Sequence, residues 1–177
     1  MIKLFEAADT LRNRILLITA YSAGLRLSEL VSLKPEHIES GRKLIRVEKG
    51  KGNKDRYTLL SDKLLKELKI YWKRYNPKEY LFYPTGNPHK PLGKNMAYKV
   101  FTRAKKKAGL TVGRGIHSLR HSFATHLLED GVDLYSIKTF LGHSSIYNTM
   151  IYLRLTQNRI KKINSPFDMY GSVIEEV

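Results

Sequence analysis

The sequence predicts a mostly α-helical domain that carries one small antiparallel β-sheet. Apolar residues recur at intervals of three and four over most of the 177 residues, which is the spacing of amphipathic helices. Two short stretches, 44–48 and 57–60, fit strands instead, and a segment rich in glycine and lysine separates them. These observations indicate a β-hairpin with a basic tip set among helices.

The helices are expected where apolar spacing is bounded by start and stop signals. A helical region over 2–21 is broken near Asp9 and Thr10, and a helix over 26–33 ends at Lys34, because a residue before proline is displaced from the helical conformation. Further helices are expected at 63–75, 95–108, 118–129, 134–141 and 145–153. Residues 80–83 are expected to add a short third strand.

Two of these helices have inward faces that the spacing identifies. The helix over 63–75 follows the capping residues Ser61 and Asp62. Its expected inward residues are Leu64, Leu65, Leu68 and Trp72, and those of the helix over 95–108 are Met96, Val100, Phe101 and Ala104.

The charge balance points to a polyanion as the partner. The chain has 32 Lys and Arg residues against 16 Asp and Glu residues, a formal charge of +16. This excess lies in segments that also carry apolar periodicity, so we expect a folded protein that binds nucleic acid. No stretch places bulky apolar residues opposite Lys and Arg on one long helix, which disfavours a membrane-surface protein.

Composition also excludes several classes of site. The chain has no cysteine, so disulfides, thiolate zinc sites and cysteine nucleophiles are excluded. No apolar run approaches the roughly 18 residues of a membrane span, and no signal peptide is present. We therefore expect a cytoplasmic protein with no membrane partner.

Three local clusters carry candidate chemistry, and each is ambiguous alone. Arg26 lies among apolar residues, where it fits either an internal ion pair with Glu29 or an anion ligand. His117 and Arg120 are three residues apart near a helix start, so they fit either an anion site or a polar surface. His143 follows a glycine that ends a helix, which fits a solvated turn equally well.

A metal site is a further alternative for the histidines. His117 and His121 are four residues apart, a spacing that can chelate a metal with His126 or His143. No acidic residue lies near the pair until the end of the helix, so we expect no metal site.

Taken together, the clusters resemble one family. Residues 23–30, 50–56, 117–128 and 141–145, followed by 149–152, closely resemble the motifs of the tyrosine recombinases, which include the phage integrases and Xer proteins. The motifs occur in that family's order and near its spacings, from residue 11 to about 155. The resemblance implies the catalytic-domain fold of the DNA breaking-rejoining enzymes.

The resemblance also implies a set of catalytic residues, namely Arg26, Lys51, His117, Arg120, His143 and Tyr152. Tyr147 is a neighbour of the expected nucleophile Tyr152 and serves as its control. Lys49 and Lys54 lie close to Lys51, but the glycines on both sides favour Lys51. Glu29 is expected to fix Arg26 rather than to touch DNA.

The implied activity is site-specific recombination through a covalent 3′-phosphotyrosine intermediate. Two arginines stabilise the charge on the phosphate as the tyrosine attacks, which is chemistry that such cations can support without metal. His117 is a plausible proton acceptor, His143 donates a hydrogen bond, and Lys51 protonates the leaving 5′ oxygen. We therefore expect no metal, no ATP and no other cofactor.

The expected partners are double-stranded DNA and further copies of the chain. We expect a tetramer on DNA and a monomer without it. Candidate phosphate contacts are Lys54, Arg56, Lys94, Lys99 and Arg103.

The chain is expected to be a single catalytic domain over 1–177. It is either excised from a protein with a separate N-terminal DNA-binding domain, which a first helix that begins at residue 2 favours, or a minimal enzyme. Its tail, 157–177, is expected to contact another subunit or to dock loosely on the monomer. Two other functions fit the same motifs: a type IB topoisomerase-like relaxing enzyme, and a non-catalytic DNA-binding module of the same fold.

Overall fold

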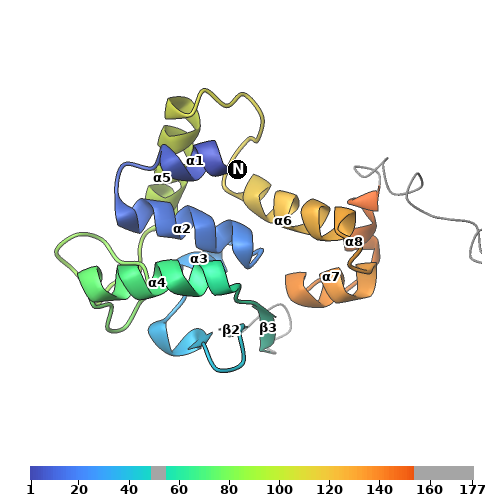
Figure 1. Ribbon diagram of the computed structural model, residues 1–177, viewed down its shortest axis with the longest axis horizontal. Coiled ribbons are helices and arrows are strands. Elements are labelled where there is room, and N and C mark those ends of the chain that lie inside the picture. Colours follow the sequence, from blue (N-terminus) through green and yellow to red (C-terminus); the bar gives the residue numbers. More distant parts are fainter. Residues whose placement is uncertain (49–54, 154–177) are drawn as a thin grey trace, which may run out of the picture.

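The structure, a computed structural model, describes residues 1–48 and 55–153, and these ranges form a group of helices with one small sheet at the lower edge in Figure 1. The helices are α1 (Ile2–Glu6), α2 (Leu11–Ser22), α3 (Leu27–Val31), α4 (Asp62–Tyr75), α5 (Lys94–Lys107), α6 (His117–Glu129), α7 (Leu134–Leu141) and α8 (Tyr147–Met150). The strands are β1 (Ile38–Glu39), β2 (Leu44–Val47) and β3 (Arg56–Leu59), and a short 3₁₀ turn, η1 (Pro35–His37), precedes β1. The expected fold class is confirmed. No helix in these ranges is both long enough and apolar enough to cross a membrane.

The helix boundaries follow the expected capping signals. The Thr10 side chain accepts a hydrogen bond from the Asn13 amide at the start of α2, and the Ser61 side chain accepts one from the Leu64 amide at the start of α4. At the other end of a helix, Gly142 adopts a left-handed conformation that terminates α7. The break at Thr10 and the stop at Gly142 are confirmed.

The sheet is antiparallel with the order β1-β2-β3, and Ile45 pairs with Thr58 and Val47 with Arg56. Strand β1 was not expected, because two residues are too few to show a pattern. The third strand expected at 80–83 is wrong. That segment bends at residues 81–82, and its Leu81 amide donates to the Leu33 carbonyl at 2.7 Å, outside any strand.

Two residues that were expected to face inward are exposed instead. Trp72 is 38% exposed and Met96 is 44% exposed, whereas their neighbours Tyr71 and Ala97 are fully buried. On α4 the hydroxyl of Tyr71 donates to the Leu81 carbonyl at 2.7 Å, which satisfies its polar atom inside the core. Helix spacing alone does not distinguish such adjacent positions on the border of a face.

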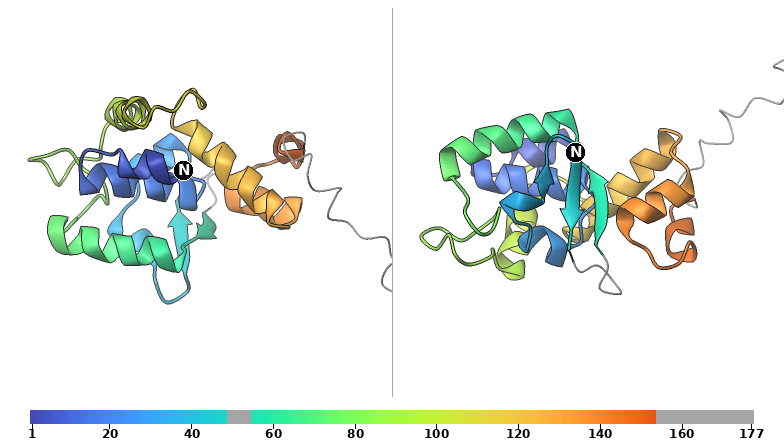
Figure 2. Two further views of the ribbon diagram at one scale, coloured as in Figure 1. Left: turned by 45° about the horizontal axis from the view of Figure 1, so that its top comes forward. Right: turned by 90° about the horizontal axis from the view of Figure 1, so that it is seen from below.

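The core has two parts, which meet where α2 packs against α6. The larger part lies among α1 to α5 and the sheet, and the smaller one gathers Phe123, Leu141 and Tyr152 among α6 to α8. Figure 2 shows α6 running from the first group of helices to α7 and α8. Tyr21 packs against both parts, and its hydroxyl lies 2.7 Å from Nδ1 of His126.

The turn after α2 joins these parts through backbone carbonyls. The Thr58 hydroxyl of β3 donates to the Ala23 carbonyl, and the Arg120 guanidinium of α6 donates to the Gly24 carbonyl, both at 2.8 Å. Gly24 has φ +58° and lies so close to Phe123 that a Cβ would overlap the ring. Glycine at this turn therefore lets the Phe123 ring of α6 pack directly against its backbone.

Gly24→Ala should lower the free energy of unfolding by about 2–4 kcal/mol, since it combines left-handed strain with overlap against Phe123. The matched control is Gly109→Ala, because Gly109 has φ +66° and no atom near its absent Cβ. The control should lose only about 1 kcal/mol, the strain alone. Urea unfolding of both variants measures the difference, and equal losses would contradict the close approach.

Candidate active site

A pocket of about 240 Å³ lies beside the first turn of α6 and brings together residues from distant parts of the sequence. Its lining residues are Arg26, His117, Arg120, His121, His143, Asn148, Ile151 and Tyr152. Five of the six expected catalytic residues are in this set. The sixth, Lys51, lies outside the described residues, as does Lys54.

Arg26 precedes α3 and points its side chain between that helix and the turn after α7. The guanidinium donates from Nη1 to Oε1 of Glu29 at 2.8 Å and from Nη2 to the Gly142 carbonyl at 3.2 Å. The backbone amide of Arg26 also donates to Glu29, at 2.7 Å. The ion pair expected from the sequence is therefore present, and the arginine in that pair also lines the pocket.

Arg120 is buried, and two backbone carbonyls hold its guanidinium. Nη1 donates to Gly24 at 2.8 Å and Nη2 donates to Leu141 at 2.6 Å. Burial, and then the charge of Arg26, lower the pKa of Arg120 to about 10, so the side chain remains positively charged at neutral pH. The helix places this charge three residues after His117, as the His-x-x-Arg spacing indicated.

Arg56 was expected among the candidate phosphate contacts, but its side chain points into the protein. Its side chain is only 9% exposed, with Nη2 2.6 Å from Oε2 of Glu29 and Nη1 donating to the Phe140 carbonyl at 2.7 Å. The sequence shows an arginine beside a basic turn, which is typical of a surface cation. The structure instead turns the side chain inward, where Glu29 compensates its charge.

Glu29 is the carboxylate around which these arginines gather. Its side chain is 10% exposed; Oε1 faces Arg26 at 2.8 Å, and Oε2 faces Arg56 at 2.6 Å and Arg120 at 3.8 Å. Three guanidinium charges against one carboxylate leave a local excess of 3 − 1 = +2. A partly buried excess of this kind favours an anion in the pocket.

His143 enters the pocket from the turn after α7. Its Nδ1 lies 3.0 Å from the hydroxyl of Thr149, which is fully buried. Burial, and then Arg120 and Arg26, lower the pKa of His143 to about 4, so the ring is neutral at pH 7. When the Thr149 hydroxyl donates to Nδ1, the ring proton is on Nε2, which is then an N–H donor.

His121 lines the pocket although it was not among the expected catalytic residues. Its ring centre lies 5.7 Å from that of Tyr152, and burial lowers its pKa. The sequence contained a signal for this position, because His121 is one helical turn after His117. The motif assigned a role only to His117, and the spacing was considered only for a metal.

Tyr152 and Tyr147 have opposite environments. Tyr152 is 2% exposed and lies in the smaller core, whereas Tyr147 is 75% exposed and does not line the pocket. Burial raises the pKa of Tyr152, while Arg120 and Arg26 act in the opposite direction. Of these two tyrosines, the structure therefore brings only Tyr152 to the arginines and histidines.

The remaining expected DNA contacts lie away from this pocket. Lys94, Lys99 and Arg103 are exposed on α5 and line no part of it. Their exposure leaves them available to solvent or to a phosphate.

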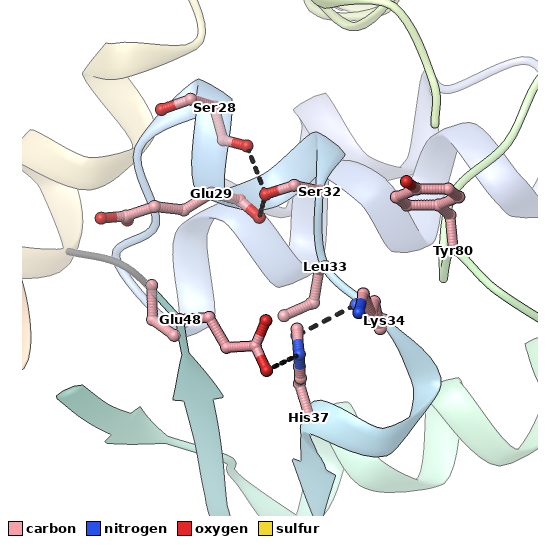
Figure 3. Close-up of a pocket in the computed structure, with 9 residues that line it drawn as sticks. Ser28, Glu29, Ser32, Leu33, Lys34, His37, Glu48 and Tyr80 are labelled. Atoms are coloured by element: carbon pink, nitrogen blue, oxygen red, sulfur yellow. Dashed lines mark hydrogen bonds and ion pairs between the residues drawn. The ribbon is translucent and has the colours of Figure 1, made fainter. Parts of the chain in front are cut away.

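A larger pocket, of about 380 Å³, is lined by His37 and Glu48 (Figure 3). Together with a third residue outside its lining, they form the one trio in residues 1–48 and 55–153 whose side chains are close enough to share a metal. The trio is Glu36, His37 and Glu48. The Lys34 amide donates to Nδ1 of His37 at 3.1 Å, so the neutral ring carries its proton on Nε2, which faces Glu48 at 3.2 Å. A protonated Nε2 offers no lone pair, so this arrangement does not fit a metal ligand.

The first pocket thus defines a class of site: a buried guanidinium, a partly exposed one and several imidazoles arranged beside a tyrosine, which suits a phosphate ester. Residues 1–159 match the phage integrase family, and the chain belongs to that family. It is 39% identical over 162 residues to tyrosine recombinase XerA of Pyrococcus horikoshii, covering 90% of this chain and 56% of that protein.

Solved structures agree with this assignment. The crystal structure of XerA recombinase superposes with a TM-score of 0.80 at 30% identity, covering 91% of this chain and 60% of that one. XerH recombinase in a post-cleavage complex with its palindromic difH substrate gives a TM-score of 0.77 at 28% identity, covering 91% and 49%. The chain spans between about half and three fifths of the length of the curated relatives that it matches.

The His143 ring should titrate with a midpoint near pH 4 in the protein without DNA. Because its pKa falls from 6.5 on folding, its contribution to stability is complete above pH 6.5 and is lost as the pH drops from 6.5 towards 4. NMR titration of the ring protons, assigned with His143→Gln, measures the midpoint. The same variant should show a shallower loss of melting temperature over that range, and a midpoint near 6.5 would contradict the assigned environment.

Proposed function

We propose that the chain is the catalytic part of a site-specific DNA recombinase, which cleaves and rejoins strands through a covalent 3′-phosphotyrosine intermediate. The observation that carries this proposal is the single pocket in which Tyr152 meets Arg26 and Arg120. Family membership supports the same activity. The proposal assigns Tyr152 as the nucleophile.

The two arginines bind the scissile phosphate. Arg26 is the more exposed of the two, at 31% of its side chain, and it reaches the pocket from the position just before α3. Arg120 is held by two carbonyls, so its charge is positioned before substrate arrives. Charges fixed in this way stabilise the additional negative charge of a pentacovalent phosphate without reorganisation during the reaction.

The cleavage step exchanges one phosphate ester bond for another and moves two protons. The Tyr152 oxygen forms a bond to phosphorus while the bond from phosphorus to the 5′ oxygen breaks. The tyrosine proton passes to the imidazole of His117, and Lys51 gives a proton to the departing 5′ oxygen. His143, neutral at pH 7, donates its N–H to a non-bridging oxygen of the phosphate.

Rejoining is the reverse of this step. The phosphotyrosine bond retains the energy of the phosphodiester, so a 5′ hydroxyl from a second duplex can attack it and release Tyr152. The proposed reaction therefore uses neither metal nor ATP.

The proposed substrate is double-stranded DNA, bound by a tetramer that assembles on the DNA from monomers. The formal charge of +16 supports binding to a polyanion. A relative, XerH, is described in complex with its difH substrate, which supports the same class of partner for this chain. Because phosphate contacts dominate such binding, affinity should fall steeply with salt.

Covalent capture tests the nucleophile. The probe is a library of nicked duplexes with randomised sequence around the nick, incubated with the protein and recovered after denaturation with detergent. Wild type should form an adduct that peptide mapping places on Tyr152, and Tyr152→Phe should form none. Tyr147→Phe is the matched control and should react at the wild-type rate, because Tyr147 is exposed and outside the pocket.

An adduct on Tyr147, or retention of DNA without any adduct, would contradict the proposal. Captured complexes are then supplied with a second duplex that carries a free 5′ hydroxyl. A recombinase should join it to the captured strand and release the protein, whereas failure to join would contradict strand exchange.

A further inference from the structure

We propose that Arg56 is a positioning residue for this pocket: its buried guanidinium fixes Glu29 and the turn before His143, and thereby sets Arg26 and His143 against the substrate phosphate. The inference rests on the proposed function, since it concerns the geometry of that reaction. It assigns Arg56 no contact with DNA.

The first support is the pair of acceptors that Arg56 connects. Nη2 holds Oε2 of Glu29 on α3 at 2.6 Å, and Nη1 holds the carbonyl of Phe140 on α7 at 2.7 Å. These acceptors belong to segments that are far apart in the sequence. The planar fork of an arginine can hold both at once, which a lysine cannot do with the same geometry.

The second support is the close packing of Arg56 against Gly142. Gly142 has φ +63°, and a Cβ at that position would overlap Cδ and Nε of Arg56. The Gly142 carbonyl accepts from Arg26, and His143 is the next residue. The Arg56 side chain therefore lies directly against the residue that connects the two proposed catalytic groups.

The third support is the free-energy cost of burying an arginine side chain at position 56. Arg56 is 9% exposed, and its Nε is buried without a hydrogen-bond partner in the described structure. An apolar side chain would fill this space without a buried charge or an unsatisfied N–H. The two bonds to Glu29 and Phe140 are the interactions that an apolar side chain would not make.

Arg56 also connects the pocket to the hairpin. It is the first residue of β3, where it pairs with Val47 at the end of β2, and β3 packs against α7. Lys51 lies between these two strands in the sequence. Fixing Arg56 therefore fixes the first described strand residue that follows the proposed proton donor along the chain.

The test measures the rate of adduct formation at saturating nicked DNA, together with DNA affinity, using the duplexes captured by wild type. Arg56→Met should slow the reaction roughly 10- to 100-fold, the range expected for misplaced catalytic groups, with affinity changed by less than about threefold. The matched control is Arg46→Met on β2, because Arg46 is also ion-paired, with Glu48 and Asp55, but lies outside the pocket. The control should change both quantities by less than about threefold.

Arg56→Lys is the second variant, in case Arg56→Met does not fold. Lysine keeps the positive charge but can hold only one of the two acceptors. Arg56→Lys should therefore restore the stability of the protein more fully than the rate of adduct formation. A folded Arg56→Lys protein that reacts at the wild-type rate would overturn the proposal.

Gly142→Ala provides an independent perturbation of the same contact. It should slow the reaction more than Gly109→Ala, which has the same backbone strain and no neighbour to displace. Because both changes act on one contact, Arg56→Met combined with Gly142→Ala should be no slower than the slower single variant. If the two losses of rate multiply in the double variant, the two changes do not act through one contact, and the proposal would be overturned.

Hydrogen exchange without DNA separates this inference from the proposed function. The amides of Gly142 and His143 donate to Thr139 and Lys138, both at 3.1 Å, and report directly on the turn. Their exchange should accelerate in Arg56→Met and not in Arg46→Met, and unchanged exchange would overturn the role of Arg56. If exchange responds while wild type forms no adduct, the proposed function fails and the structural role of Arg56 stands.

Discussion

The arrangement of the pocket depends on one buried carboxylate. Glu29 lies within 4 Å of Arg26, Arg56 and Arg120, which come from three different parts of the sequence. Three guanidinium charges so close together in a partly buried space repel one another and lose part of their hydration. Without the carboxylate, their charge would be uncompensated. Glu29 offsets that cost while leaving the pocket positive.

The rest of the site is consistent with this constraint. Burial and the excess positive charge keep His143 neutral at pH 7, so it can donate a hydrogen bond without adding charge. Burial raises the pKa of the Tyr152 phenol, while Arg120 and Arg26 act in the opposite direction. A phosphate that enters the pocket would neutralise part of the excess, which makes the substrate one of the groups that stabilise the arrangement.

The sequence predicted those features that depend on local spacing, and it failed where long-range packing decides. The Arg26–Glu29 pair, the helix break near Thr10 and the cap at Ser61 are local, and the structure confirms them. The direction of Arg56 depends on α3 and α7, which no pattern near residue 56 describes, so it was placed among the candidate phosphate contacts. The segment 80–83 is apolar because it is buried, and the pattern of a buried loop resembles that of a strand. The role of Lys51 stays a prediction, since it lies outside the described residues.

The most direct test of the central role of Glu29 is the rate of covalent capture by Glu29→Gln at saturating nicked DNA. The amide keeps the shape of the side chain but not its charge, so the arginines should move apart. The account predicts a rate roughly 10- to 100-fold below wild type, with DNA affinity equal or higher because the net charge rises by one. A folded Glu29→Gln protein that forms the adduct at the wild-type rate would contradict the account.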